Sequence, residues 1–486
     1  MLRNISKIIF VFSVLFIVLT IILKPFQLMG LTDQGYWINF FYNIVNNGEP
    51  VTSLNNRHNF LEHSLLIVIA PLAYIKSPIA LSYALYYLTY LSWFLTFYLL
   101  YLGQFEIKKV FKSFLLFFCS TTILLHYGLN YNGWNSIYIA PAILLTSYYF
   151  SFIRSEYTKS IVIYLPLLLL KIQFWLIFPF FLSSIYLHSK NKKYLIYAVL
   201  SILTFYLYIN VRPNIFGEST TGILLDTAYS HIISYDLNIF FETFLRNIPL
   251  KLSLISAFFV QFIFLINFKA IKRNDALIAL LLILPIFSYC ILSSRTVMSY
   301  WTHEHYALPV LPVIFLIFLK YGILSRIRIT LFVIVNLILI LGILSLKEPW
   351  QYKYYQDETQ LNNNIMTLMT TSYNDHILAD DRTGLYFTNN QVNFLKYIED
   401  RNREPKYVVL NLRYIYYINN IQRHRSKEAS SSFEFINDYV KNLNDYGILY
   451  LNYPFVVYEK NLKSDLEINL NMLNNWDQKI LSDNRY

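Results

Sequence analysis

Six ionisable side chains lie in one short stretch that follows the first apolar segment of the chain. They are Asp33, Glu49, Arg57, His58, Glu62 and His63. A carboxylate such as Asp33 can be a general base, a metal ligand or simply a helix N-cap, and these roles are compatible. Glu62 and His63 are adjacent, so on a helix they point in different directions and cannot chelate one ion as neighbours. Ionisable groups beside a bilayer tend to be functional or paired, so Asp33, Arg57, Glu62 and His63 are candidate site residues.

A second polar group stands where a late apolar segment begins. It reads His303-Glu304-His305-Tyr306, and Arg295 shortly precedes it. In an extended segment His303 and His305 would face the same side. Together with Arg295 they could bind a phosphate or pyrophosphate group, although an ordinary interfacial loop also explains them. The spacing differs from the HExxH motif of metalloproteases, so zinc hydrolysis is excluded.

Lys171 is a lone cation inside an apolar run. A charge is costly against lipid, so this side chain either reaches an interface or meets an anion. The chain has no phosphate-binding P-loop, no GxGxxG after a strand and no GxSxG nucleophile motif. A nucleotide-driven pump is therefore not expected.

The composition is that of a polytopic membrane protein. Of the 486 residues, 56% are hydrophobic and only 14% are charged, whereas soluble domains average about 25% charged residues. The net charge of +11 falls mostly in short loops between apolar runs, which indicates membrane orientation and not nucleic-acid binding. Cys119 and Cys290 both lie in apolar runs, so neither a disulfide framework nor a metal cluster is expected.

The apolar runs predict about eleven membrane spans, with basic loops inside and the N-terminus cytoplasmic. The spans are 8–23, 79–102, 113–126, 136–152, two short ones within 161–187, 194–211, 250–268, 276–293, one that ends near 320, and 329–346. The run 161–187 is broken by Pro166 and around Lys171, so we expect its two halves to meet near the outer face. The segment 64–75 is too short to cross and is predicted as a juxtamembrane helix.

Another juxtamembrane helix is predicted around Asp33. Aromatic and aliphatic residues recur on one side of it, at Tyr36, Trp37, Phe40, Phe41, Ile44 and Val45, and asparagines fall on the other, at positions 39, 43, 46 and 47. This pattern is typical of an amphipathic helix that lies flat in a membrane interface. Thr32 or Asp33 stands at the expected N-cap and Gly48 at the expected C-cap.

Beyond Lys347 the composition changes to asparagine-rich turns and short apolar runs. We predict a membrane domain over 1–346 and a small α/β domain over 347–486, which the odd number of spans places outside. Two strands are expected, at Tyr407–Leu410 and Phe455–Tyr458. A polar cluster that contains Asp375 and His376 is explained by a solvated turn.

With these motifs in view, the chain resembles the DUF2079 family of bacterial membrane proteins, which belongs to the GT-C superfamily of integral-membrane glycosyltransferases. The resemblance rests on Asp33-x-Gly35, Gly48-Glu49, Asn59-Phe60-Leu61-Glu62-His63-Ser64, Ala70-Pro71-Leu72, Lys76-Ser77-Pro78, His305-Tyr306 with Pro309, and Tyr407-Val408-Val409-Leu410. The chain departs from the family at two places. A histidine is common where this chain has Asn130, Asn132 and Trp134, and acidic residues commonly follow Lys171, where Ile172-Gln173 stand here.

The resemblance implies an α-helical polytopic membrane protein with a GT-C-like fold and an extracytoplasmic C-terminal domain. It implies transfer of a sugar from a polyprenyl-phosphate donor to a glycan, lipid or protein acceptor on the outer face of the bacterial cytoplasmic membrane. Asp33 would then be the base or a metal-linked carboxylate, with Mg²⁺ or Mn²⁺ as the cation in the second case. The predicted substrate contacts are Arg57, Glu62, His63, Lys171, Arg295, His303, Glu304, His305 and Tyr306.

Two other classes of function remain open. One is a transporter or flippase of a lipid-linked glycan, and the other is a non-catalytic scaffold whose tail recruits a partner. A transporter is expected to place ionisable groups at mid-membrane and to have related halves. In this sequence the polar residues crowd the predicted outer face, which favours the enzyme.

Overall fold

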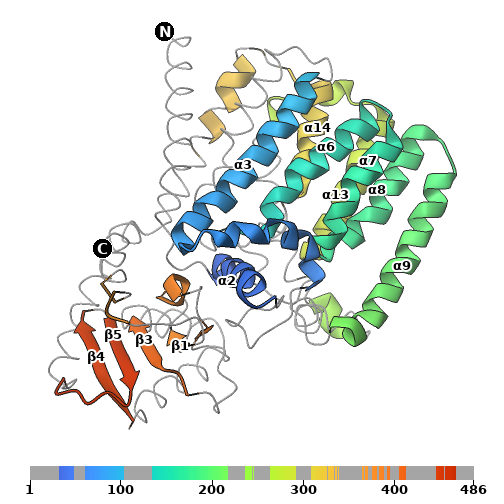
Figure 1. Cartoon of the computed structure of the whole chain (residues 1–486). Coiled ribbons are helices and arrows are strands. Elements are labelled where there is room, and N and C mark those ends of the chain that lie inside the picture. Colours follow the sequence, from blue (N-terminus) through green and yellow to red (C-terminus); the bar gives the residue numbers. More distant parts are fainter. Residues whose placement is uncertain are drawn as a thin grey trace.

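The computed structural model describes three long stretches of the chain and a series of shorter ones. The long stretches are 32–48, 61–102 and 134–216, and the shorter ones are 236–242, 263–291, 308–323, 327–338, 364–369, 375–379, 383–387, 391–394, 404–411, 445–453 and 455–466, some with single-residue gaps. The predicted spans 8–23 and 113–126, and most of 250–268 and 329–346, lie outside the described residues. Within those residues, helices form one bundle and the strands form a separate sheet (Figure 1).

The helical part has α-helices joined by short 3₁₀ segments. In chain order these are α2 (Thr32–Asn47), η3 (Leu61–Tyr74), α3 (Pro78–Leu102), η5 (Ser136–Ile139), α6 (Ala140–Phe152), α7 (Tyr157–Tyr164), η6 (Leu165–Leu169), α8 (Gln173–Ser189), α9 (Lys193–Phe216), η7 (Phe268–Ala270), α13 (Arg273–Ile291) and α14 (Val310–Tyr321). The helix positions predicted for 79–102, 136–152 and 194–211 are confirmed, and that predicted for 276–293 is confirmed as far as Ile291, where the described residues end. The break within 161–187 is confirmed too, because Pro166 stands at the start of η6 and α8 begins only at Gln173.

Membrane crossing itself is a separate matter from helix position. Within the described residues one helix, α9 over Lys193–Val211, is long and apolar enough to cross a bilayer, and a single such helix is weak evidence. Large apolar side chains on α9 and α3 are nevertheless open to the surroundings; they include Ile196, Val199, Leu203, Leu207, Leu91, Phe94 and Leu95. Soluble proteins rarely leave so much contiguous apolar surface uncovered. This surface supports the predicted membrane location, which stays a prediction.

One end of the bundle is closed by a group of polar side chains that we call the basal cluster: Tyr157, His188, Asp275, Lys320 and Tyr321. Lys320 Nζ lies 2.9 Å from an Asp275 carboxylate oxygen, and the Tyr321 hydroxyl donates to the other oxygen. Tyr157 and His188 are joined by a 2.9 Å hydrogen bond between the hydroxyl and Nδ1. The cluster therefore brings the starts of α7 and α13 to the ends of α8 and α14, so neighbouring helices run in opposite directions.

The C-terminal strands form a mixed five-stranded sheet with the order β2-β1-β3-β5-β4. The strands are β1 (His376–Ala379), β2 (Gln391–Phe394), β3 (Tyr407–Asn411), β4 (Tyr446–Asn452) and β5 (Phe455–Lys460), and a 3₁₀ segment, η10 (Thr383–Phe387), follows β1. β1 is parallel to both of its neighbours, and β5 is antiparallel to both of its own. The two strands predicted from the apolar runs, β3 and β5, are confirmed. The sheet lies on the same side of the bundle as α2, and η10 contacts α2 and α3 (Figure 1).

The basal cluster should contribute measurably to stability. Asp275→Asn removes the negative charge of the ion pair and keeps the size of the side chain. Both Asp275 and Lys320 are only 18–20% exposed. We expect the free energy of unfolding to fall by about 1.5–3 kcal/mol, measured by tryptophan fluorescence on the purified protein in detergent. Glu156→Gln is the matched control, because Glu156 pairs with Arg154 and Lys159 while 39% exposed, and such pairs contribute about 0–1 kcal/mol. Equal losses in both variants would contradict a special role for the cluster.

The alternation of helix direction also predicts the topology. Reporter fusions in the loop that carries Lys190 and Lys192, and in the loop before Arg273, should report a cytoplasmic location, because both loops adjoin the basal cluster. Fusions after Lys347 should report an external location. An external reading at Lys192 or a cytoplasmic tail would overturn the predicted orientation.

Candidate functional site

Helix α2 positions the candidate catalytic residue. The described part of α2 begins at Thr32, so the backbone of Asp33 lies in the first turn of that part. The N-cap prediction for Thr32 or Asp33 stays a prediction, because helix ends are defined only to within one or two residues. The helix dipole stabilises an acidic residue in the first turn of a helix, as it does one at the N-cap. The C-terminal prediction is confirmed: Gly48 has a φ of +69°, and its N–H donates to the Ile44 carbonyl at 2.9 Å.

The expectation that α2 turns its asparagines toward water is wrong for the middle of the helix. Asn39 is 0% exposed and Asn43 is 3% exposed, and the amide of Asn43 donates to Asn39 at 3.2 Å. Neighbouring elements cover this side: the Tyr42 hydroxyl donates to the Ile75 carbonyl, just beyond η3, at 2.9 Å, and Tyr36 packs against the core of the C-terminal sheet. The middle of α2 is therefore covered by the rest of the protein on both sides, and its predicted place at a membrane interface stays a prediction.

A pair of tryptophans fixes the first half of α2. Trp37 follows Asp33 by one helical turn, so the two positions lie on the same side of the helix. The Trp37 ring meets Trp134 edge-on, with the ring centroids 6.4 Å apart. The Trp134 indole N–H donates to the Thr89 hydroxyl of α3 at 3.0 Å. The start of α2 is thereby tied to the segment that leads into α6.

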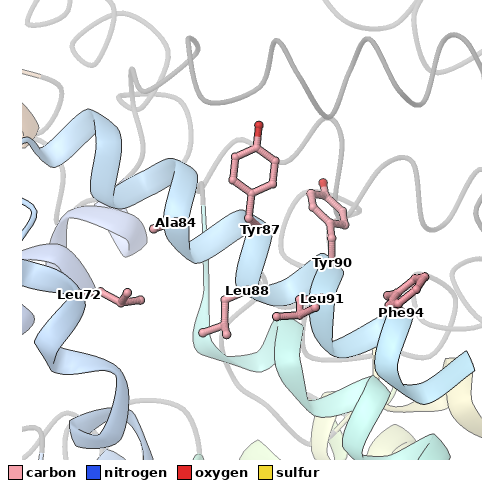
Figure 2. Close-up of a pocket in the computed structure, with 7 residues that line it drawn as sticks. All are labelled: Leu72, Ala84, Tyr87, Leu88, Tyr90, Leu91 and Phe94. Atoms are coloured by element: carbon pink, nitrogen blue, oxygen red, sulfur yellow. The ribbon is translucent and has the colours of Figure 1, made fainter. Parts of the chain in front are cut away.

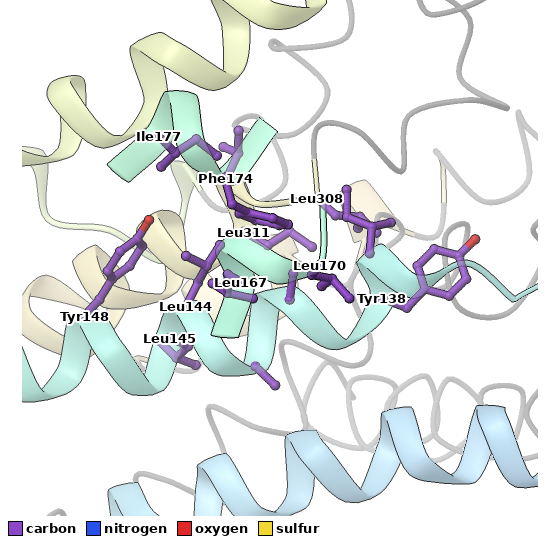
Figure 3. Packing of buried hydrophobic residues seen from close by; sticks show 14 of the residues in the cluster. Tyr138, Leu144, Leu145, Tyr148, Leu167, Leu170, Phe174, Ile177, Leu308 and Leu311 are labelled. Atoms are coloured by element: carbon purple, nitrogen blue, oxygen red, sulfur yellow. The ribbon is translucent and has the colours of Figure 1, made fainter. Parts of the chain in front are cut away.

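The break between η6 and α8 lies at the same level as the start of α6. Serines set the register of the antiparallel pair α6 and α7, because the Ser160 hydroxyl donates to the Ser147 carbonyl at 2.7 Å and also receives a hydrogen bond from Ser151. Continued along the pair, this register brings Leu170 beside Tyr138. Figure 3 shows these two side chains near each other within one buried cluster, together with Leu308 from the segment before α14.

Side chains satisfy the backbone at the break. The Trp175 indole N–H donates to the Leu168 carbonyl at 2.9 Å, and the Tyr164 hydroxyl donates to the Phe174 carbonyl at 2.9 Å. Lys171 is half-buried in the break, and α8 has no acidic residue in its first turn. A helix N-terminus carries partial positive charge, so Lys171 and the start of α8 form an electropositive end. This supports the anion-binding interpretation of Lys171.

The predicted site residues divide into two groups. The structure describes the backbone of Asp33, Glu62, His63 and Lys171. The other predicted site residues lie outside the described residues: Arg57, Arg295, His303, Glu304, His305 and Tyr306. Glu62 and His63 lie in the first turn of η3 and not in a loop before it. η3 contacts both α2 and η6, so it connects the helix that carries Asp33 to the segment before Lys171. Leu308, which packs near the break, follows His305 by three positions in the sequence.

Metal binding is not supported by the part of the chain that the structure describes. No three His, Cys, Asp or Glu side chains come together there. The side chains of the first-loop carboxylates lie outside that part, so metal binding by Asp33 stays a prediction. In the tail, Asp375 pairs with Lys406 at 3.0 Å, and this bond raises the pKa of Lys406. The carboxylate is thus engaged in a structural pair, and His376 is the first residue of strand β1, so the solvated turn predicted for these two residues is wrong.

A shallow groove of about 560 Å³ runs along α3 beside η3. It is lined by Leu72, Ala84, Tyr87, Leu88, Tyr90, Leu91 and Phe94 (Figure 2). These side chains offer an almost wholly apolar surface that fits an aliphatic chain. No carboxylate or cation is among them, so the groove is not the place of the chemistry.

Sequence reasoning missed the roles of Trp134 and Gln173. Trp134 was noted only as a departure from the family, yet it anchors α2. Gln173 begins α8 and is buried. The one signal for it in the sequence is an amide residue set between Ile172 and Phe174 in an apolar run, directly after a lysine.

The comparisons with known proteins add nothing to this geometry. No protein-family model matches the chain, and no curated protein is significantly similar to it. The resemblance drawn from the short motifs therefore stays a prediction.

The contact between Trp37 and Trp134 predicts an energetic coupling between α2 and the start of α6. In a double-mutant cycle with Trp37→Leu and Trp134→Leu, we expect a coupling of about 0.5–1.5 kcal/mol in the free energy of unfolding. Trp37→Leu combined with Trp175→Leu is the control pair, because Trp175 stacks on Tyr208 instead, at 5.2 Å. If the first pair were as additive as the control pair, the proposed anchoring of α2 would be wrong.

Proposed function

We propose that this protein is a membrane glycosyltransferase that takes its sugar from a polyprenyl-phosphate donor and acts on the outer face of the bacterial cytoplasmic membrane. The observation that carries the proposal is the arrangement at the bundle end opposite the basal cluster. There the break with Lys171 lies level with the start of α6, and η3 and Trp134 connect it to α2, which carries Asp33. The backbone positions of Asp33 and Lys171 thus belong to separate elements that are connected through η3.

This pair of groups suits glycosyl transfer from a lipid phosphate. The acceptor hydroxyl attacks the anomeric carbon, the bond from that carbon to the phosphate oxygen breaks, and polyprenyl phosphate leaves with the bonding electrons. Lys171 and the N-terminus of α8 are proposed to stabilise the departing phosphate. Asp33 is proposed to take the proton of the acceptor hydroxyl.

The lipid form of the donor is supported by the surface of the bundle. The uncovered apolar side chains of α3 and α9, and the apolar groove beside η3, suit contact with aliphatic chains. A donor anchored in the membrane brings its phosphate to the interface without a nucleotide, and the sequence has no nucleotide-binding motif.

The distribution of charge favours this enzyme over a transporter. α3, α6 and α8 contain no Asp, Glu, Lys or Arg, and the charged residues of α13 and α14 lie at the basal cluster. A transporter would be expected to carry ionisable groups in the middle of such helices.

The catalytic assignment predicts that Asp33→Asn abolishes activity without loss of folding. Asn keeps the size of Asp but cannot accept the proton, so we expect a fall of roughly 10²–10⁴-fold in rate. The measurement is transfer of labelled sugar from a polyprenyl-phosphate donor, or restoration of the glycan in a deletion strain, at matched protein levels.

Asp236→Asn is the matched control for this experiment. Asp236 caps its helix, accepting hydrogen bonds from the N–H groups of Asn238 and Ile239 at 3.1 Å, so Asn should replace it with little effect. Near-normal transfer by Asp33→Asn would rule out Asp33 as the base and leave Glu49 or Glu62 as candidates.

A further inference from the structure

Among the described residues, the buried side chain of Gln173 has no hydrogen-bond partner. The residue is 3% exposed, and neither its amide nitrogen nor its amide oxygen is bonded. The Ser136 hydroxyl is fully buried and unbonded as well. Buried polar side chains nearly always have a partner, because an unsatisfied amide in apolar surroundings loses its bonds to water and gains nothing. A partner other than the described residues is therefore expected here.

The position of Gln173 relates it to the proposed reaction. It is the first residue of α8 and follows Lys171 by two positions, at the bundle end opposite the basal cluster. α8 has 17 residues, which places its two ends about 25 Å apart. The register of α6 and α7 sets this end level with η5, where Ser136 is the first residue. Two unbonded polar side chains thus belong to the same end of the bundle, and Gln173 stands two positions from the cation proposed to hold phosphate.

The chemistry of the amide identifies the class of partner. An amide presents two donor hydrogens and an acceptor oxygen side by side. A phosphate at neutral pH offers acceptors, so it would leave the amide oxygen unsatisfied. Neighbouring sugar hydroxyls both donate and accept, and they match the amide fully. We infer that Gln173 recognises hydroxyl groups of the donor sugar, a role that rests on the proposed function.

The test separates recognition of the sugar from recognition of the lipid phosphate. The probes are undecaprenyl phosphate and its glucosyl, galactosyl and mannosyl derivatives, titrated against the purified full-length protein in detergent. In Gln173→Leu the amide is lost and the volume is kept. We expect affinity for the preferred sugar-linked probe to fall about 5- to 100-fold, as for two lost hydrogen bonds. Affinity for bare undecaprenyl phosphate should stay within about twofold.

Two further variants support the comparison. Ser184→Ala removes another buried polar group of α8, but one that is bonded to the Phe180 carbonyl at 2.8 Å. It should bind every probe as the wild type does. Gln173→Met retains the unbranched shape and serves in place of Gln173→Leu if that protein does not fold.

The outcomes distinguish this inference from the proposed function. If the wild type binds none of the sugar-linked probes, the proposed function fails. If the wild type binds one of them and the Gln173 variant binds it equally well, an ordered water fills the site and the inference fails alone. A parallel loss of the bare and the sugar-linked probes also overturns the inference, because the amide would then serve the phosphate or the fold.

Discussion

A helical backbone interrupted inside an apolar bundle leaves peptide groups that neither lipid nor packed hydrocarbon can satisfy. In this protein the interruption lies between η6 and α8, and aromatic side chains close it from both sides. Trp175 reaches back to the Leu168 carbonyl, and Tyr164 reaches forward to the Phe174 carbonyl. These two hydrogen bonds reduce the free-energy cost of interrupting the helix between η6 and α8. The rest of the proposed site depends on that interruption, since it allows Lys171 and Gln173 to stand within an otherwise apolar run.

The two ends of the bundle differ in how their polar groups are satisfied. At the basal cluster the protein supplies the partners: Asp275 is bonded by Lys320 and Tyr321, and His188 by Tyr157. At the other end the amide of Gln173 has no partner among the residues that the structure describes. A saturated polar group rigidifies a structure, whereas an unsaturated one retains binding capacity. The basal end is therefore suited to holding helices together, and the other end to holding a ligand.

The sequence was sufficient for features that depend on local pattern. Apolar runs located the helices, Pro166 and Lys171 located the break, Gly48 located the end of α2, and two short apolar runs located β3 and β5. It was insufficient where contacts between distant segments decide the environment. Asn39 and Asn43 look like a water-facing stripe until η3 and the C-terminal domain cover them. The basal cluster joins residues more than a hundred positions apart along the chain, and nothing local marks them as partners.

The contact of Tyr36 with the core of the C-terminal sheet has a consequence for biogenesis. α2 is among the first segments to be synthesised, and the strands that cover one of its sides are among the last. Domains fold as units while the chain emerges. One side of α2 therefore stays uncovered until the final strands have folded beside it. The early loop and the late domain therefore mature together. A chain truncated before β3 would contain all the bundle helices. One side of α2, the candidate catalytic helix, would lack the sheet that it packs against.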